Sequence, residues 1–300
     1  MKGVKIRYTG VSFTIMKGKF RNDLIIMLKG FLIGSSMSVP GVSGGTMAIL
    51  LGIYDKLIGS ISNFLKDIKG NFIFLIKFCI GSALGIGSLA FLIKWLLETY
   101  TIPVSFFFLG AVIGGIPALY KKTKDRPLGI SSGIYFLLGL GIVISIGFIP
   151  AGNLTVSTGS GLMHYIMLLV TGIIIALALV LPGISTSHML LVLGMYDALL
   201  TAITEFNIMF IGILGIVTVI GIFLITKPLE WTMNRFPHQT YFMIIGFVLG
   251  STFEIFRDKI LPAVPAATDA LWWIFTALMS VITFALGMKA ILSLSRFSND

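Results

Sequence analysis

Long apolar runs without a single charged residue alternate with short charged segments along this 300-residue chain. A charge at the centre of a bilayer costs about 2.5–3.5 kcal/mol on insertion scales, so charge-free runs mark the segments that can lie in hydrocarbon. They are residues 30–54, 78–93, 99–120, 127–196, 206–226, 236–253 and 270–288. One spanning helix needs about 20 residues. The pattern predicts an all-α polytopic membrane protein, with spans at about 73–97, 102–120, 128–150, 208–226, 239–256 and 271–293.

Proline and glycine interrupt two of the charge-free runs. The run 127–196 is 70 residues long, so it must fold back more than once. Pro150-Ala-Gly-Asn153 ends one predicted span, and Leu181-Pro-Gly183 breaks the apolar stretch that follows. The run 30–54 carries the same kind of break at Val39-Pro-Gly41. Because proline lacks the N–H that a helix interior needs, each Pro-Gly pair predicts a broken helical hairpin.

The two breaks belong to an internal repeat. When the chain is shifted by 142 positions, segment 38–55 lies over segment 180–197 without a gap. A weaker likeness follows downstream, between Leu109-Gly-Ala-Val-Ile-Gly114 and Ile245-Gly-Phe-Val-Leu-Gly250. Each half therefore reads as a broken, re-entrant helical hairpin plus three transmembrane helices. The coinciding residues of the two hairpins are Pro40 and Pro182, Gly41 and Gly183, Ser43 and Ser185, Met47 and Met189, Leu51 and Leu193, Gly52 and Gly194, Tyr54 and Tyr196, and Asp55 and Asp197.

The number of spans predicts an inverted repeat. A hairpin returns the chain to the side where it started, and three spans then deliver it to the other side. With a cytoplasmic amino terminus, 19 of the 22 Lys and Arg residues fall inside, and only Lys94, Arg257 and Lys259 fall outside. This agrees with the positive-inside rule, so both termini are expected in the cytoplasm. The hairpins can also be full spans, because 162–181 alone is long enough to cross.

This organisation divides the chain into three parts. Residues 1–23 form a basic cytoplasmic segment without an apolar core, unlike a cleaved signal peptide. Residues 24–150 form the first repeat, with its hairpin at 24–62. Residues 160–293 form the second, inverted repeat, with its hairpin at 162–204.

Composition narrows the class of protein further. Hydrophobic residues make up 56% of the chain and charged residues 11%, whereas soluble domains carry roughly 25% charged residues. A water-soluble enzyme is excluded, and a multi-pass protein of the cytoplasmic membrane is expected. The net charge of +10 follows the predicted topology, so no nucleic-acid partner is expected. The single cysteine, Cys79, excludes an intrachain disulfide and a cysteine metal cluster.

Small hydroxyl residues follow both Pro-Gly pairs. Lipid cannot satisfy the backbone groups that a break frees, so these segments must face protein or a wet cavity. The free N–H groups of Ser43–Thr46 and Ser185–His188, at the positive ends of restarting helices, predict an anion site. Two such tips, entering from opposite faces, would meet near the midplane, where secondary transporters hold their substrate. The alternative is that the breaks are kinks and the small residues are packing contacts.

The hairpin motifs resemble a known family. Gly34-Ser-Ser-Met-Ser-Val-Pro-Gly-Val-Ser-Gly-Gly-Thr46 with Leu51-Gly-Ile-Tyr-Asp55, and Leu181-Pro-Gly-Ile-Ser185 with Leu193-Gly-Met-Tyr-Asp197, are similar to the signature hairpins of the bacterial polyprenyl-phosphate translocases. The resemblance covers about residues 24–293. It implies a lipid transporter, not an enzyme. Such a transporter returns undecaprenyl phosphate from the outer to the inner leaflet of the cytoplasmic membrane, where the carrier lipid is reused in cell-wall (peptidoglycan) synthesis.

The resemblance also implies which residues bind the phosphate head group. Many relatives have an Asp shortly before the first Pro-Gly, where this chain has Ser36 and Ser38, so an acidic role at that spot does not carry over. The spacing adds the residues that open the second helix restart, Thr186, Ser187 and His188. The family's motifs fall on Pro40, Gly41, Ser43, Gly44, Gly45, Thr46, Pro182, Gly183 and Ser185.

Five titratable residues are candidates for coupling or for phosphate capture. His188 breaks the symmetry of the two hairpins. It can bind phosphate as imidazolium, couple transport to protons, or be a neutral histidine bonded to a backbone carbonyl. Asp55 and Asp197 each follow a Gly-x-Tyr and are either interfacial caps or proton carriers. Glu254 and Arg257, three apart on one helical face, are expected to form a structural pair, and phosphate capture by Arg257 is the other interpretation.

Enzyme signatures are absent from the sequence. It has no His-Glu-x-x-His zinc pattern, no Walker loop and no Gly-x-Ser-x-Gly elbow, so neither a metal site nor a cofactor is predicted, and proton coupling stays open. One rival function is a membrane-embedded polyprenyl-(pyro)phosphate phosphatase, which needs an acidic or Arg/His cluster beside the phosphate. Another is a small-anion carrier, which needs no access for lipid. The sequence does not specify the oligomeric state.

Overall fold

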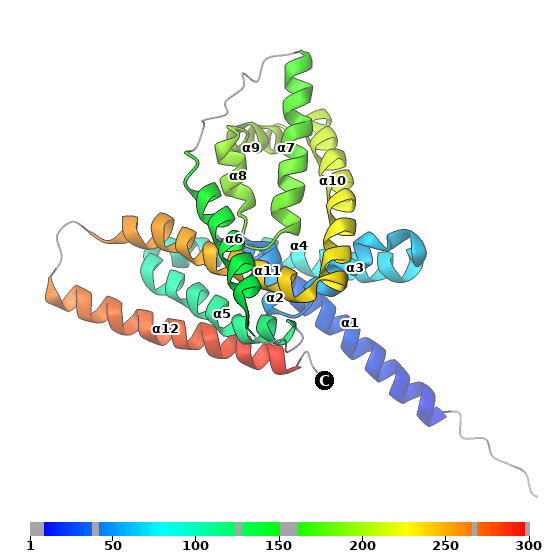
Figure 1. The fold of residues 1–300 in the computed structure, drawn as a ribbon, viewed down its shortest axis with the longest axis horizontal. Coiled ribbons are helices and arrows are strands. Elements are labelled where there is room, and N and C mark those ends of the chain that lie inside the picture. Colours follow the sequence, from blue (N-terminus) through cyan, green and yellow to red (C-terminus); the bar gives the residue numbers. More distant parts are fainter. Residues whose placement is uncertain (1–8, 38–41, 124–127, 151–160, 266–268, 298–300) are drawn as a thin grey trace, which may run out of the picture.

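The computed structural model describes residues 9–37, 42–123, 128–150, 161–265 and 269–297, and every regular element in these ranges is a helix (Figure 1). Pro40 and Gly41, the first break of the sequence, lie outside the described residues. Helices satisfy their own backbone hydrogen bonds, which hydrocarbon requires of any segment exposed to lipid. The prediction of an all-α membrane protein is therefore confirmed.

The helices follow one another in the same order in both halves of the chain. The short helices occur at matching positions of the repeat. Helices α2 and α8 have seven residues each and begin at 44 and 186. Helices α3 and α9 have nine residues each and begin at 54 and 196. The first half contains α1 (Thr9–Met37), α2 (Gly44–Leu50), α3 (Tyr54–Ser62), the 3-10 turn η1 (Phe64–Lys66), α4 (Ile68–Thr99), α5 (Thr101–Lys121) and α6 (Ile130–Gly147). The second half contains α7 (Leu162–Val180), α8 (Thr186–Val192), α9 (Tyr196–Thr204), α10 (Ile208–Arg235), α11 (Pro237–Ile255), the π-helical turn η2 (Phe256–Ile260), the 3-10 turn η3 (Leu261–Ala263) and α12 (Ala270–Phe297).

The amino-terminal helix is longer than the sequence pattern suggests. The first hairpin was expected to begin at residue 24, after a basic segment 1–23, but α1 already begins at Thr9. A lysine-rich sequence is compatible with a helix, because lysine and arginine have high helix propensity. The predicted boundary between basic segment and hairpin is therefore not a helix boundary.

Glycine makes the turn between the short helices possible in both halves. Gly52 and Gly194 have φ values of 65° and 66°, a left-handed conformation that glycine adopts without the steric cost that other residues incur. Each turn follows α2 or α8 directly and precedes α3 or α9. This explains why the Leu-Gly-x-Tyr-Asp motif occurs twice: its glycine fixes the bend and the residues after it begin the next helix.

The longer helices pack in pairs, two of which join one half of the chain to the other. Within the halves, α1 packs along α4, and α7 packs along α10. Between the halves, α5 lies along α12, and α6 lies along α11 (Figure 1). Glycine permits these close approaches: a Cβ at Gly110 would lie 2.0 Å from the Phe284 carbonyl oxygen, and one at Gly246 would lie 2.2 Å from that of Phe136.

Seven helices of the described residues are long and apolar enough to cross a membrane. Six of them coincide with the predicted spans, and the seventh is α7, the first arm of the second hairpin. Large apolar side chains cover their outer faces, among them Phe91, which is 82% exposed, and Leu271, which is 72% exposed. Helices α8 and α9 meet at an angle of 107°, so together they form a broken span or a re-entrant loop. The protein is therefore a multi-pass membrane protein.

Candidate functional site

The second helix break contacts α2, the helix that follows the first break. The backbone N–H of Gly183 donates to Thr46 Oγ1 at 2.9 Å, and Gly45 lies so close that a Cβ there would be 3.2 Å from Pro182 Cα. The Tyr54 hydroxyl donates to the Val180 carbonyl at 2.7 Å, just before the second break. A backbone group released by a break needs a polar partner when it is buried, and α2 and α3 supply such partners to the second hairpin.

Gly183 is fixed by its backbone conformation and by its surroundings. Its φ of +83° lies in the left-handed region, and a Cβ there would lie 2.3 Å from the Phe247 carbonyl oxygen of α11. Pro182, beside it, is fully buried. The second break is therefore held between α2 on one side and α11 on the other.

Just after the first break, one buried hydroxyl has no hydrogen-bond partner among the described residues. Ser43 precedes α2 and is 4% exposed, and its Oγ makes no hydrogen bond within the part of the chain that the structure describes. Gly44 and Gly45 open α2 and border a cavity of about 190 Å³. The rest of that cavity is apolar, with walls from α1, α3, α4, α7 and α10.

The second break borders a polar cavity of about 240 Å³. Ser185 precedes α8, and its Oγ accepts a hydrogen bond from the His188 backbone N–H at 3.3 Å. Thr186 is the first residue of α8, half-buried, and does not line this cavity. The lining residues are Ser185, Ser187, His188, Leu191, Glu254, Asp258 and Lys259. Hydroxyl, imidazole, carboxylate and ammonium groups thus share one space.

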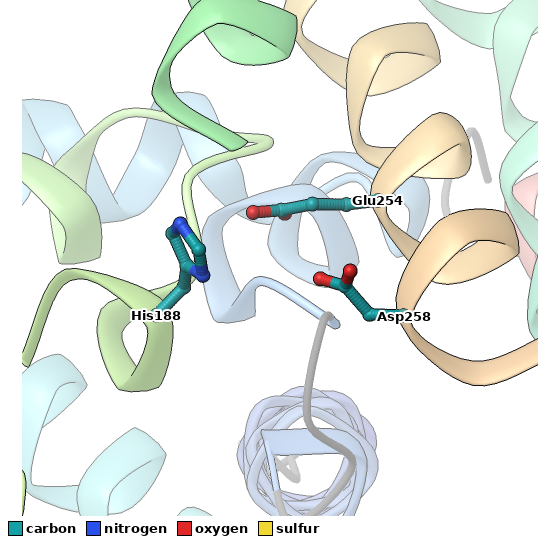
Figure 2. Close-up of side chains that lie close together, drawn as sticks. All are labelled: His188, Glu254 and Asp258. Atoms are coloured by element: carbon teal, nitrogen blue, oxygen red, sulfur yellow. The ribbon is translucent and has the colours of Figure 1, made fainter. Parts of the chain in front are cut away.

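Three titratable side chains converge on this cavity from two segments. His188 comes from α8, Glu254 from α11 and Asp258 from η2, and all three point toward one another (Figure 2). One ligand atom from each side chain lies within 4.8 Å of the other two. Glu254 is 4% exposed, and its Oε2 has no hydrogen-bond partner among the described residues.

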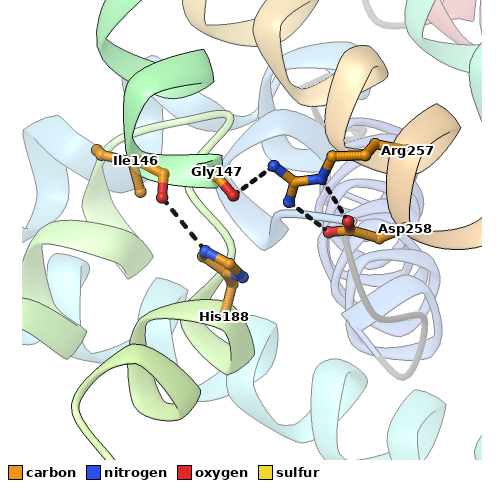
Figure 3. A network of polar contacts seen from close by, with 5 residues as sticks. All are labelled: Ile146, Gly147, His188, Arg257 and Asp258. Atoms are coloured by element: carbon orange, nitrogen blue, oxygen red, sulfur yellow. Dashed lines mark hydrogen bonds and ion pairs between the residues drawn. The ribbon is translucent and has the colours of Figure 1, made fainter. Parts of the chain in front are cut away.

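His188 and Arg257 both interact with the carboxyl end of α6 (Figure 3). His188 Nε2 lies 3.3 Å from the Ile146 carbonyl, and Arg257 Nη1 donates to the Gly147 carbonyl. The last carbonyls of a helix lack partners inside the helix. Arg257 supplies one to Gly147, whereas the Ile146 carbonyl also accepts from the Ile149 N–H at 3.0 Å. This contact agrees with one of the three interpretations of His188, that of a histidine bonded to a backbone carbonyl, and all three roles remain predictions.

The expected pair of Glu254 and Arg257 is wrong. Arg257 instead pairs with its neighbour Asp258: Nε lies 2.6 Å from Oδ1, and Nη2 lies 2.9 Å from Oδ2. Arg257 and Asp258 both lie in the π-helical turn η2, which begins at Phe256, so the α-helical spacing on which the expected pair was based does not hold there. The guanidinium is committed to Asp258 and α6, and Glu254 keeps a free carboxylate oxygen in the cavity.

The two aspartates that follow the hairpins lie apart from this cavity. Asp55, in the first turn of α3, forms an ion pair with Lys122 at the end of α5. Asp197, in the first turn of α9, is exposed and forms no ion pair within the described ranges. Neither lines the polar cavity.

Sequence reasoning missed two charged residues of the cavity, Asp258 and Lys259. Both lie in the charged segment after the fifth predicted span, in which only Arg257 was considered for the site. The signal that could have found Asp258 is its spacing of four from Glu254, because side chains four apart lie on one face of a helix.

A helix break that meets the start of another short helix inside a bundle of apolar helices, beside a cavity with polar walls, is typical of membrane transporters with discontinuous helices. Residues 33–270 match the family described as undecaprenyl phosphate translocase-like, and the chain belongs to this family. The chain is 35% identical over 290 residues to the polyprenyl-phosphate transporter of Staphylococcus aureus, which covers 92% of this chain and 97% of the relative.

A second relative gives the same result. The chain is 33% identical over 262 residues to the polyprenyl-phosphate transporter of Vibrio cholerae, with 81% of each protein covered. These names are those of transporters, not enzymes, as the sequence analysis expected. No solved structure matches the chain.

Proposed function

We propose that the protein carries undecaprenyl phosphate, or a similar polyprenyl phosphate, from the outer to the inner leaflet of the cytoplasmic membrane, so that the carrier lipid can be reused in cell-wall synthesis. The observation that carries this proposal is the direct contact of the second break with α2, from Gly183 to Thr46, beside a polar cavity. The names of the family and of both relatives support the lipid substrate.

The phosphate head group is proposed to bind at the two tips. Ser43 offers a buried hydroxyl without a described protein partner, and Ser185 and Ser187 add hydroxyls to the polar cavity. Hydroxyls donate to phosphate without a fixed positive charge, so they bind the anion and still release it. Lys259, in the same cavity, and Arg257, paired with Asp258 next to it, contribute charge to the attraction.

The polyprenyl chain is proposed to remain among apolar side chains while the head group moves. The cavity at Gly44 and Gly45 is almost entirely apolar. A larger cavity of about 500 Å³ lies next to Leu181, just before the second break, between residues of α6, α10 and α11. Polar side chains at one part of its wall, Thr232, Gln239 and Thr240, adjoin Trp231 and Phe236, a combination typical of the membrane interface.

The inverted arrangement of the halves belongs to the same proposal. With both termini in the cytoplasm, each break enters from its own side of the membrane, and two related gates expose one site alternately. The recurrence of helix order and the equal lengths of the short helices support it. Proton coupling through His188 remains part of the proposal, with an altered pH profile of transport in His188→Gln as its test.

Reconstitution into liposomes tests the function. The purified protein should accelerate exchange of a labelled polyprenyl phosphate between leaflets and release no inorganic phosphate. Absence of exchange overturns the proposal. Release of phosphate indicates a phosphatase instead. This alternative is tested because His188, Glu254 and Asp258 lie close together beside Ser185. Exchange of free phosphate without exchange of the lipid indicates an anion carrier.

A pair of glycine variants tests the assignment of the site to the tips. In Gly45→Val the new side chain meets the backbone of Pro182, whereas a Cβ at Gly87, in the middle of α4, meets nothing within 4 Å. Exchange should fall at least about tenfold in Gly45→Val and stay near the wild-type rate in Gly87→Val, with both proteins inserted in the membrane. Equal exchange rates in the two variants would contradict the assignment of the head-group site to the tips.

A further inference from the structure

Among the described residues, Glu254 is the one buried carboxylate with an oxygen that has no hydrogen-bond partner. An ionised carboxylate in a site that is 4% exposed needs a cation or several donors, because burial removes its water. Arg257 forms no ion pair with Glu254, because its guanidinium contacts Asp258 and the Gly147 carbonyl instead. One oxygen of Glu254 therefore points into the cavity without a described protein partner.

We propose that His188, Glu254 and Asp258 form a binding site for a divalent transition-metal cation such as Mn²⁺ or Zn²⁺. Imidazole nitrogen with carboxylate oxygen is a ligand set that suits such ions. Bonds of about 2.0–2.2 Å to a tetrahedral ion place the ligand atoms about 3.3–3.6 Å apart. The three ligand atoms already lie within 4.8 Å of one another, so small side-chain rotations bring them to one ion (Figure 2).

The hydrogen bond of His188 prepares its ring for this role. A carbonyl oxygen only accepts, so the contact of 3.3 Å with Ile146 assigns a proton to Nε2. In the neutral ring, Nδ1 then carries the lone pair that a metal ion needs. Ligating histidines commonly donate their other N–H to a carbonyl or carboxylate in this way, which fixes the tautomer and the ring orientation.

The charges around the site permit a cation and also limit its affinity. Glu254 and Asp258 supply two negative charges, and Arg257 already neutralises part of the second. Lys259 lines the same cavity and repels a bound cation. We therefore expect moderate affinity, with open coordination positions for water or for an anionic ligand beside Ser185 and Ser187.

The site has a use if the proposed function is correct. A divalent cation with open positions bridges carboxylates to a phosphate and neutralises its charge, which lowers the cost of holding the phosphate at membrane depth. This role rests on the proposed function, whereas the metal site itself does not.

Binding of Mn²⁺ to the detergent-solubilised full-length protein tests the site. The electron paramagnetic resonance signal of free Mn²⁺ should fall with a stoichiometry of one ion per chain, and Zn²⁺ should displace the bound ion. Glu254→Gln and His188→Gln should each weaken binding at least about tenfold. The matched control is Glu98→Gln, since Glu98 is an exposed carboxylate paired with Lys94 outside the cavity, and it should bind as the wild type does.

Lys259→Gln gives a test with the opposite sign. Removal of its charge should tighten Mn²⁺ binding several-fold, which a general loss of folding cannot imitate. The proposal is overturned if no stoichiometric binding occurs, or if Glu254→Gln binds as tightly as Glu98→Gln. Leaflet exchange is measured separately with and without chelator. Failure of exchange with intact Mn²⁺ binding counts against the proposed function, and loss of binding with intact exchange counts against the metal site.

Discussion

The short helices that follow the two helix breaks have similar backbones and different chemistry. Helices α2 and α8 have equal lengths, and both end in a left-handed glycine turn. With Gly114 aligned to Gly250, however, Ala118 stands where the second half has Glu254, and Lys122 stands where it has Asp258. The residues that bend the chain are thus duplicated, whereas His188, Glu254 and Asp258 of the polar cavity have no counterpart of the same kind in the first half.

The difference extends to the hydrogen bonds of the tips. Thr46 accepts a hydrogen bond from the opposite break, whereas His188, at the matching position, contacts the end of α6. A threonine side chain is short, so its hydroxyl accepts a hydrogen bond only from a backbone in direct contact with it. The longer imidazole reaches another helix and leaves one nitrogen for the cavity. We interpret the first break as the one that holds the junction together and the second as the one that carries titratable groups.

The largest expected effect comes from Gly183, which packs the second break against α11. Gly183→Ala forces a left-handed residue against the Phe247 carbonyl, which should cost about 2–5 kcal/mol of stability. Gly129→Ala is the control, because a Cβ there meets nothing within 4 Å. Thermal unfolding in detergent measures both variants. If they unfold at the same temperature, the second break is not clamped by α11.

Thr46→Val tests whether the junction depends on the first break. The substitution keeps the shape of the side chain and leaves the Gly183 N–H without its acceptor, which should cost about 1–3 kcal/mol. His188→Gln should cost less, because the side-chain contact to Ile146 is longer and half-buried. Equal losses, measured as unfolding midpoints, would show that the two positions are equivalent and would contradict the comparison.

Ser43→Ala separates binding from stability. The hydroxyl has no described protein partner, so its removal should leave the unfolding midpoint unchanged or slightly higher. If Ser43 donates to the phosphate, leaflet exchange should fall about tenfold, which corresponds to roughly 1.4 kcal/mol. Ser88→Ala, at an exposed serine of α4, is the control for both measurements. An unchanged exchange rate would assign Ser43 to packing.

The smallest expected effect concerns the aspartates that follow the hairpins. Asp55→Asn breaks a partly exposed ion pair with Lys122 and should lower stability by less than about 1 kcal/mol. Asp197→Asn should have no measurable effect, because no ion pair is found for it in the described part of the chain. A larger loss from Asp197→Asn would show that the second aspartate has a partner outside the protein.

The spans and the register of the short helices were predictable, because both depend on local sequence. The candidate spans overlap six of the seven charge-free runs, and the run 127–196 contains two of them, α6 and α7. The repeated Pro-Gly and Leu-Gly-x-Tyr-Asp motifs marked the short helices.

The contacts of the site were not predictable, because they join segments far apart in the chain. The bond from Gly183 to Thr46 depends on how the halves pack. Arg257 pairs with Asp258 in a π-helical turn, and the spacing of residues in the sequence does not predict such a turn. The sequence analysis looked for a carboxylate within the hairpins, whereas the carboxylates of the cavity come from α11 and η2.

The packing of α5 along α12 and of α6 along α11 has a consequence for how such a chain can be divided. Each half supplies helices whose long-range partners belong to the other half. A half-length chain could reproduce these contacts only with a second copy, as an interleaved dimer. Joining the halves in one chain makes that association independent of protein concentration. It also allows the two copies of each motif to diverge, so that one break can acquire acidic neighbours while its counterpart does not.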